Sequence, residues 1–222
     1  MKEPRHVGAD AGLSKQRVVA EAVRLADSEG VDGLSMRRLA GVLGAGAMSL
    51  YHYVASKDEL LDAMIDIVFE EIELPPLEVD WQSAMRREAI STQKVLARHP
   101  WAISLMESRT SPGPANLRHR EAVTACLRRA GFSPLTATHA NWLLNSYVYG
   151  YALQASSLPF DTADQLADMT EDVYLPQLPP DEFPYLNESA TALLAAGYDP
   201  TEEFVFGLDV VLAALEPLRA ST

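Results

Sequence analysis

A glycine corner between two short segments of helical character restricts the fold of this 222-residue chain more than any other feature. Apolar residues follow helical spacing from Ser35 to Leu43, and a second short segment extends from Ala47 to Tyr53. Gly44 follows the first segment and can adopt a positive φ at little steric cost. Two short helices joined by a glycine turn have the geometry of a helix-turn-helix, and the sequence predicts this motif over residues 35–53.

Five further residues have the positions that the packing of such a motif requires. Ala40 offers a small side chain where the two helices cross. The side chains placed to hold the second helix against the first are Leu39, Leu43, Leu50 and Tyr53. An ordinary αα-hairpin would satisfy part of this pattern, so the window by itself leaves that alternative open.

Helical periodicity extends over most of the chain, whereas strand-like alternation and Asn-Gly hairpin signals are missing from the sequence. Five of the helical segments follow a residue suited to an N-cap, namely Ser14, Ser35, Ser56, Ser133 and Asp199. Glu59, three residues after Ser56, completes a capping-box pattern. The predicted fold class is therefore all-α, with a three-helix head that contains the helix-turn-helix and a larger C-terminal helical bundle.

Prolines divide the expected helices into parts. Pro75 and Pro76 follow the helix that opens at Ser56 and mark a domain boundary. The expected organisation is a flexible arm over residues 1–13, a helix-turn-helix head over 14–72 and a body over 77–222. Helices of the body are expected at about 81–97, 115–130, 134–157, 185–196 and 200–215, with a proline-rich loop at 176–184.

The net charge of −13 argues at first against a nucleic-acid partner. Its distribution changes that argument, because residues 1–60 contain eight basic and eight acidic side chains and the whole negative excess follows them. A neutral head can approach DNA, whereas phosphate groups would repel an acidic body. The asymmetry is equally compatible with chance.

Cysteine usage and hydropathy bound the cellular setting. Cys126 is the one cysteine of the chain, so neither a disulfide within the chain nor a cysteine-based metal cluster can form. Residues 1–10 are polar and unlike a signal peptide, and no run of eighteen apolar residues is present. We therefore expect a cytoplasmic protein without a membrane span.

Four sequence blocks resemble the tetracycline-repressor (TetR) family of bacterial regulators. They are Gly33-Leu34-Ser35-Met36-Arg37-Arg38-Leu39-Ala40, Leu43-Gly44, Ser49-Leu50-Tyr51-His52-Tyr53-Val54 and Lys57-Asp58-Glu59-Leu60-Leu61. A weaker likeness to the tetracycline-responsive branch rests on residues 129–133 and 203–209. The resemblance implies a DNA-reading head and a helical body for ligand binding and dimerisation. It also implies a ligand-responsive regulator, taken as a repressor that a small hydrophobic effector releases from a palindromic operator.

The resemblance assigns roles to residues of the head. Arg37 matches a position that reaches a base edge, where arginine can pair with guanine O6 and N7; a solvated arginine is the alternative. Arg38 is either a phosphate contact or a solvated charge. Ala47 and Met48 begin the recognition helix and, being apolar, would contact thymine methyl groups. The expected phosphate contacts are Ser49, Tyr51, His52 and Lys57, the last in the first turn of a helix whose dipole adds to the attraction.

A pocket for the effector would need apolar and aromatic walls with a few polar groups. The candidate walls are Trp101, Met106, Trp142 and Tyr149. Asn141 and Asn145, four residues apart on one helical face, are the candidate polar anchors. Ordinary core packing is the competing interpretation of each aromatic residue.

In the tetracycline-responsive branch, a histidine a few residues before a threonine holds a magnesium-bound drug. Counting back from Gly131 places Glu107 at the histidine position and Thr110 at the threonine position. Because the histidine is missing, we predict no metal and no cofactor. The expected effector is a hydrophobic or aromatic small molecule other than magnesium-tetracycline.

The last helix and the helix over 134–157 are the expected contacts of a homodimer. The segment 200–215 is apolar over much of its surface, and it contains Gly207 as the other helix contains Gly150. A glycine inside a helix costs about 1 kcal/mol relative to alanine, which suggests a close helix approach. Two-fold pairing of these helices would place the heads in successive major grooves, about 34–36 Å apart.

Two other classes of protein stay open as alternatives. One is a helical small-molecule sensor or adaptor that does not bind DNA. The other is a small helical enzyme, although the chain has no recognised nucleotide-binding, nucleophile or zinc-protease motif and its five histidines lack ligand spacing. The sequence does not distinguish a repressor from an activator, nor does it identify the effector or the operator.

Overall fold

The computed structural model describes residues 13–109, 111–159, 162–197 and 199–220. Within these ranges the chain is all-α, as predicted, and contains no strand. The first half comprises α1 (Lys15–Glu29), α2 (Met36–Leu43), α3 (Ala47–Leu50), α4 (Lys57–Glu70), α5 (Trp81–Arg98), η1 (Pro100–Ala102), α6 (Ile103–Met106) and α7 (Pro114–Arg129). All but the last residue of the expected N-terminal arm, and also Thr110, lie outside the described residues.

The second half of the chain continues the helical pattern. Its elements are α8 (Pro134–Ser157), α9 (Ala163–Met169), the π-helical turn η2 (Thr170–Tyr174), η3 (Leu175–Gln177), α10 (Pro184–Ala196), α11 (Pro200–Leu215) and η4 (Glu216–Ala220). The proline-rich loop expected at 176–184 thus begins inside a helical turn. After η3, the carbonyl of Leu178 accepts a hydrogen bond from the side-chain Nδ2 of Asn187 at 2.8 Å, and this bond joins the loop to α10.

The helices form two compact units. The N-terminal unit contains the described residues up to Pro75 together with Lys94–Val123, and the C-terminal unit contains Pro76–Gln93 and the described residues from Thr124 onward. The boundary expected at Pro75-Pro76 coincides with the first change of unit. Nothing in the sequence indicates that residues 94–123 group with the head.

The helices of the N-terminal unit begin at the predicted caps. The hydroxyl groups of Ser14, Ser35 and Ser56 accept hydrogen bonds from backbone N–H groups three residues later, at 3.2, 3.2 and 3.0 Å. Each helix then buries one apolar stripe, and the side chains with no exposed surface are Val18, Ala22, Leu39, Leu50, Leu60, Met64 and Val68. These residues come from α1, α2, α3 and α4, so all four helices contribute to one core.

Glu59 departs from the predicted capping box. One of its carboxylate oxygens accepts from the backbone N–H of Ala55 at 2.7 Å, and the other lies 2.6 Å from Lys15 Nζ. The bond to Lys15 and the bond from Ala55 lower the pKa of Glu59. The side chain therefore joins the starts of α1 and α4, instead of returning to the residue that caps its own helix.

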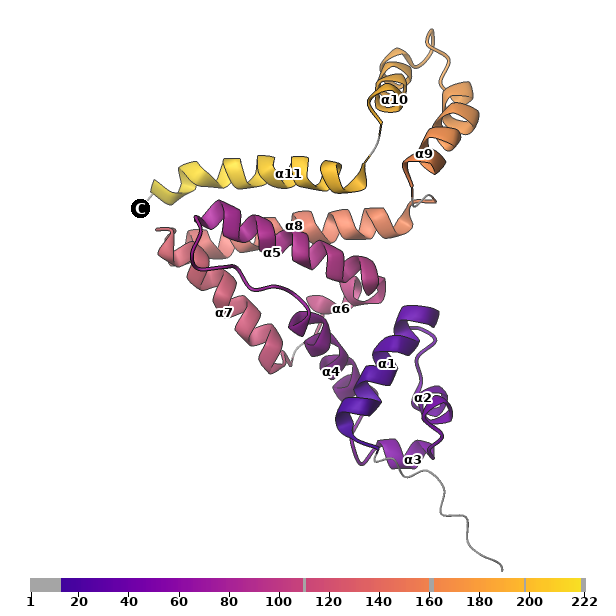
Figure 1. Cartoon of the computed structure of the whole chain (residues 1–222), viewed down its shortest axis with the longest axis vertical. Coiled ribbons are helices and arrows are strands. Elements are labelled where there is room, and N and C mark those ends of the chain that lie inside the picture. The colour runs from indigo at the N-terminus through magenta and orange to yellow at the C-terminus, as the bar shows by residue number, and fades with distance from the viewer. Residues whose placement is uncertain (1–12, 110, 160–161, 198, 221–222) are drawn as a thin grey trace, which may run out of the picture. The chain divides into compact units, whose positions relative to one another are not determined.

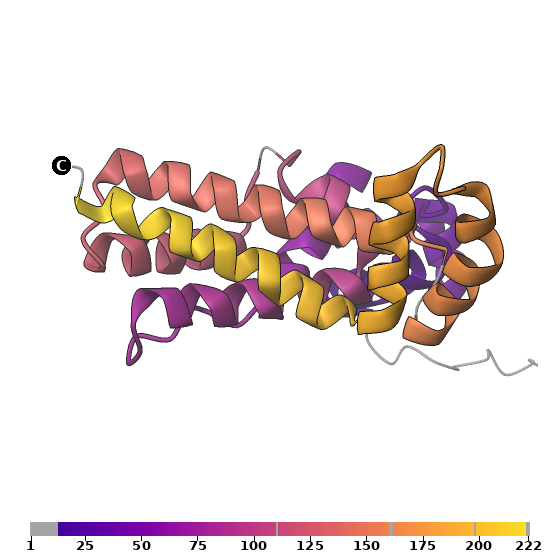
Figure 2. The same ribbon diagram turned by 90° about the horizontal axis from the view of Figure 1, so that it is seen from above.

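In the C-terminal unit α8 and α11 lie side by side along most of their length (Figure 1; Figure 2). Ser133 caps the start of α8, where its hydroxyl accepts from Thr136 N. Asp199 caps the start of α11, where its Oδ1 accepts from Thr201 N at 2.7 Å. The bounds of both helices confirm the prediction. Buried apolar side chains from α8 and α11 contribute to the core of this unit, among them Leu144, Val148, Phe204, Leu208 and Leu212. The described helices include no segment with the length and hydropathy of a bilayer span.

Candidate functional site

Gly44 ends α2 and turns the chain into α3. Its φ of 65° and ψ of 28° lie in the left-handed region, and across the corner Ala45 N donates to the carbonyl of Ala40 at 2.9 Å. Ala40 is 2% exposed, while Leu39 and Leu50 are fully buried. The predicted helix-turn-helix is confirmed, with a recognition helix of four residues followed by a turn.

Most of the predicted DNA contacts lie on the open surface of this motif. Met48 on α3 exposes 77% of its surface and Tyr51 exposes 43%. Arg37, His52 and Lys57 are also exposed, while the smaller Ala47 and Ser49 are half-buried. The structure thus leaves a long apolar side chain and several polar ones accessible around one helix.

Arg38 differs from the other candidates because it has a partner within the head. Its Nη2 lies 2.5 Å from Glu29 Oε1, and its Nε donates to Glu29 Oε2 at 3.3 Å. The bond lowers the pKa of Glu29 and raises that of Arg38. The side chain joins the start of α2 to the end of α1 and stays 54% exposed, and its role as a phosphate contact or as a solvated charge stays a prediction.

Arg109, which follows α6, contacts two aspartates of α4. Its Nε lies 2.5 Å from Asp62 Oδ1, and its Nη2 donates to the carbonyl of Asp58 at 3.0 Å. Asp58 and Asp62 are one helical turn apart, so one guanidinium spans both. The side chain of Arg109 is only 17% exposed, and its bond to Asp62 raises its pKa.

One turn further along α4, Asp66 caps a different helix. Its Oδ1 accepts from the backbone N–H groups of Ala115 and Asn116 at 2.9 and 3.0 Å. The first N–H groups of a helix lack intrahelical partners, so this carboxylate satisfies two groups at the start of α7. Gly113 leaves room for it, because a Cβ there would lie 2.3 Å from the Asp66 carboxylate.

A further contact joins α1 to the turn after α5. Asp27 Oδ1 lies 2.7 Å from His99 Nδ1 and accepts from Trp101 Nε1 at 2.7 Å. The other ring nitrogen of His99 lies 3.3 Å from Glu71 Oε2. His99 and Trp101 are buried, so Asp27 holds two side chains of a segment more than seventy residues away.

These connecting residues were not identified from the sequence. Asp27, Asp66 and Arg109 carry no motif, and their partners lie far away in the chain. The four-residue spacing of Asp58, Asp62 and Asp66 is the one signal that could have found part of the set, since it aligns three carboxylates on one face of α4.

The six predicted effector contacts fall into two groups. Trp101 and Met106 are buried in the N-terminal unit, at 7% and 1% exposure. On α8 in the C-terminal unit, Trp142 exposes 65% of its surface, and the residues that are half-buried there are Asn141, Asn145 and Tyr149. Their role in effector binding stays a prediction.

Glu107 has a protein partner at the position matched to the magnesium-binding histidine. Its Oε2 lies 3.2 Å from Arg120 Nη2. The matched threonine, Thr110, lies outside the described residues. The absence of a metal stays a prediction.

Helices α8 and α11 together expose an apolar surface. Its large side chains, each between 46% and 68% exposed, are Leu135, Trp142, Leu143, Leu153, Phe206 and Val210. A cavity of about 570 Å³ opens between the two helices, and Tyr147, Tyr151 and Phe206 are among its walls. Such a surface is typical of an interaction site.

Gly207 makes the predicted close approach with a different partner. A Cβ at this position would lie 2.4 Å from Tyr147 Oη, and that hydroxyl donates to the carbonyl of Phe204 at 2.7 Å. The approach is therefore between α8 and α11 of one chain, and Gly207 is no evidence for a dimer contact. At Gly150 a Cβ would meet no atom within 4 Å, so the described chain shows no close approach there.

Comparison with known proteins links both parts of the chain to one group of regulators. The family model for bacterial regulatory proteins of the tetR family matches residues 18–64. The model for the tetracyclin repressor-like C-terminal domain matches residues 74–219.

Individual relatives align over nearly the whole chain. The HTH-type transcriptional repressor DrrR1 from Streptomyces coeruleorubidus is 34% identical over 96% of this chain and 81% of DrrR1. The tetracycline repressor protein class C from Escherichia coli is 25% identical over 95% of this chain and 94% of its own length. The structure of ActR from Streptomyces coelicolor in complex with actinorhodin is 33% identical, covers 95% of this chain and 100% of ActR, and gives a TM-score of 0.76.

Proposed function

Since this chain belongs to the TetR family of bacterial regulatory proteins, we propose that it is a repressor that binds a palindromic operator as a homodimer. Members of the family are ligand-responsive, DNA-binding transcriptional regulators rather than enzymes, and this chain is such a regulator. The observation that carries the proposal is the Gly44 corner, which fixes a short helix so that Met48 stays 77% exposed.

The head would read DNA with α3 in the major groove. Arg37 would supply the bidentate contact to guanine, and Ala47 and Met48 would contact thymine methyl groups. Lys57 stands in the first turn of α4, where the unpaired N–H groups of the helix also attract phosphate. The remaining phosphate contacts would be Ser49, Tyr51 and His52, while Arg38 would have to leave Glu29 to take part.

Selection of genomic fragments at moderate salt, followed by fluorescence anisotropy, tests the DNA contacts. Arg37→Ala should weaken binding to the selected site by about 1–3 kcal/mol and relax its sequence preference. Lys57→Ala should weaken binding to selected and random DNA alike and reduce the salt slope by about one. Arg87→Ala, which removes an exposed arginine of α5, is the matched control.

Two outcomes would contradict the proposed DNA contacts. If the intact protein selects no fragment, the chain is a sensor without DNA binding. If Arg87→Ala weakens the selected site as much as Arg37→Ala, the effect of Arg37 is only one of overall charge.

Dimerisation would use the apolar surface of α8 and α11. Regulators of this family are dimers, and exposed side chains such as Leu143, Phe206 and Val210 would be covered by a second copy. Phe206→Glu places a charge in that surface and should shift the sedimentation of the protein toward the monomer. Leu77→Glu, which changes another exposed apolar residue, should leave the dimer intact.

The effector would be a small hydrophobic or aromatic molecule held by α8, with Asn141 and Asn145 as polar anchors and Trp142 and Tyr149 as apolar walls. The relative ActR is solved with actinorhodin, and that molecule is the natural first probe. If it dissociates this chain from its operator, Asn145→Ala should weaken that response without changing operator affinity. Thr138→Ala, an exposed change on the same helix, should preserve both.

A further inference from the structure

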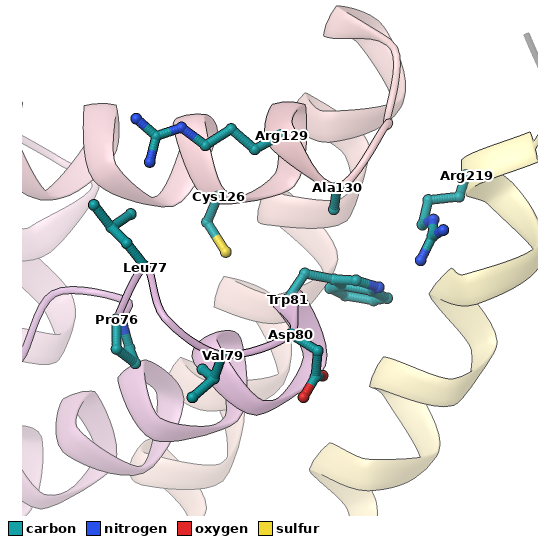
Figure 3. A pocket seen from close by; sticks show the side chains of 9 residues that line it. All are labelled: Pro76, Leu77, Val79, Asp80, Trp81, Cys126, Arg129, Ala130 and Arg219. Atoms are coloured by element: carbon teal, nitrogen blue, oxygen red, sulfur yellow. The ribbon is translucent and has the colours of Figure 1, made fainter.

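A second cavity, of about 390 Å³, lies in the C-terminal unit among the segment before α5, the end of α7 and η4 (Figure 3). Its volume falls within the range of small-molecule sites, about 300–1,000 Å³. None of its lining residues belongs to the predicted DNA or effector contacts. An inference drawn from this cavity is therefore independent of the proposed repressor function.

One part of this cavity is apolar and held in place. Leu77 and Val79 come from the segment that leads into α5, and Trp81 is the first residue of that helix. The indole of Trp81 packs edge-on against Phe132 with ring centroids 5.0 Å apart, and its N–H donates to Glu216 Oε2 at 2.9 Å. Leu77 is 65% exposed, so a molecule in the cavity would cover apolar surface that now faces water.

The charged residues of the cavity are unequally compensated. Arg219 Nη1 lies 2.9 Å from Glu216 Oε1, and Asp80 Oδ1 accepts from Ser83 N at 3.0 Å as the cap of α5. Arg129 has no carboxylate partner among the described residues. Figure 3 shows Arg129 on α7 above Leu77, while Arg219 points toward Trp81. Arg129 is therefore the cationic group of the cavity that is available to an anion.

We propose that this cavity binds a small organic acid with a flat apolar body. The carboxylate pairs with the guanidinium of Arg129, and the body lies against Leu77, Val79 and Trp81. The carboxylates near the cavity, Asp80, Glu88 and Glu216, already accept hydrogen bonds from protein groups, so the ligand has no need to displace them. Loss of either the acid group or the apolar body weakens binding, since each contacts a different wall.

Cys126 provides a reporter for this site. It lines the cavity, is 8% exposed and is the one cysteine of the sequence. Burial raises the pKa of its thiol, so the thiol stays protonated and reacts slowly near neutral pH. A ligand in the cavity covers the sulfur and slows alkylation further. The Trp81 indole N–H gives a second, non-covalent readout by NMR.

The test compares 2-naphthoic acid with its neutral analogue 2-naphthamide on the full chain. N-ethylmaleimide labelling of Cys126 is followed by intact mass, and the Trp81 indole resonance is followed in the same titrations. The acid should protect Cys126 and shift Trp81, with an affinity about five- to tenfold above that of the amide. Arg129→Gln should remove this difference, whereas Arg87→Gln should preserve it.

Three results would overturn the proposal. The first is equal binding of acid and amide to the wild-type protein. The second is the absence of both protection and a Trp81 shift at millimolar acid. The third is an equal loss in Arg87→Gln and Arg129→Gln, which would show that only the overall charge of the protein matters.

Discussion

Both compact units have an apolar core, and they differ in the contacts that join their helices in addition to it. In the N-terminal unit, Asp27, Asp66 and Arg109 make hydrogen bonds and ion pairs between segments that are 47 to 74 residues apart in the chain. In the C-terminal unit, α8 and α11 meet mainly through buried apolar and aromatic side chains such as Leu144, Phe204 and Leu208. The first kind of contact is directional, and the second depends on area.

This difference sets the expected energetic cost of removing each kind of contact. A hydrogen bond contributes about 0.5–1.5 kcal/mol net, and it weakens steeply when its donor–acceptor distance or its angle leaves the preferred range. A buried leucine contributes about 2–5 kcal/mol and tolerates small shifts. Loss of one of these polar contacts in the N-terminal unit should therefore lower the free energy of unfolding less than loss of one buried leucine between α8 and α11.

The largest expected effect is in the apolar contact. Leu208→Ala removes a fully buried side chain of α11 and should lower the free energy of unfolding by about 2–5 kcal/mol. Urea unfolding at one fixed protein concentration measures this change. Leu117→Ala, at a position of α7 that is 54% exposed and outside the proposed dimer surface, should cost far less, and an equal loss in both variants would contradict the burial of Leu208.

A smaller effect is expected where α8 and α11 approach most closely. Gly207→Ala forces a Cβ against the phenol of Tyr147 and should cost about 1–3 kcal/mol. Tyr147→Phe removes the hydroxyl oxygen, the nearest of the opposing atoms, so the double variant should be less destabilised than the sum of the two single variants. Strict additivity in the unfolding experiment would show that the two residues do not meet.

The contact of Asp66 with α7 should be worth about 1–2 kcal/mol. Asp66→Ala leaves two backbone N–H groups of α7 without their acceptor, whereas Asp66→Asn keeps an oxygen acceptor and should lose less. Because α4 carries Lys57, we also expect Asp66→Ala to lower operator affinity more than its loss of stability explains. Thermal unfolding and anisotropy together separate the two effects, and unchanged operator affinity would limit Asp66 to a structural role.

The smallest expected effect is a dependence on pH at the start of α4. Lys15 and the backbone N–H of Ala55 hold the pKa of Glu59 below its usual value, so its contribution to stability is present above about pH 4.3 and disappears as the pH falls through the lowered folded-state pKa. Glu59→Gln should lose this contribution at neutral pH and show a shallower decline of stability in acid. Identical pH profiles of the two proteins would indicate that the exposed pair contributes nothing.

Local chemistry explains what the sequence predicted well. Ser14, Ser35 and Ser56 cap the helices that follow them, and Gly44 adopts the left-handed conformation, because each of these features depends on residues within a few positions. Asp66 could not be predicted as a cap, since it acts on a helix that begins 48 residues later. The capping box predicted for Glu59 is replaced by bonds to Ala55 N and to Lys15, which lies 44 residues away in the chain.

The candidate DNA contacts and the candidate effector contacts also differ in whether they depend on nearby or distant residues. Arg37 and Met48 follow from a short motif, and the structure finds both exposed. The aromatic side chain of Trp101 suggests a pocket wall, yet its environment depends on Asp27, which lies 74 residues away in the chain. Residues whose surroundings are set by distant segments cannot be separated into core and pocket by spacing alone.

The methionine methyl resonances test most directly whether α3 presents Met48 to the bases of DNA. With ¹³C-methyl-labelled methionine, addition of the selected operator should shift Met48 strongly and leave the buried Met85 nearly unchanged. Random DNA of equal length should perturb Met48 much less. A protein that binds the operator tightly while the Met48 methyl resonance stays at its free position would contradict the account.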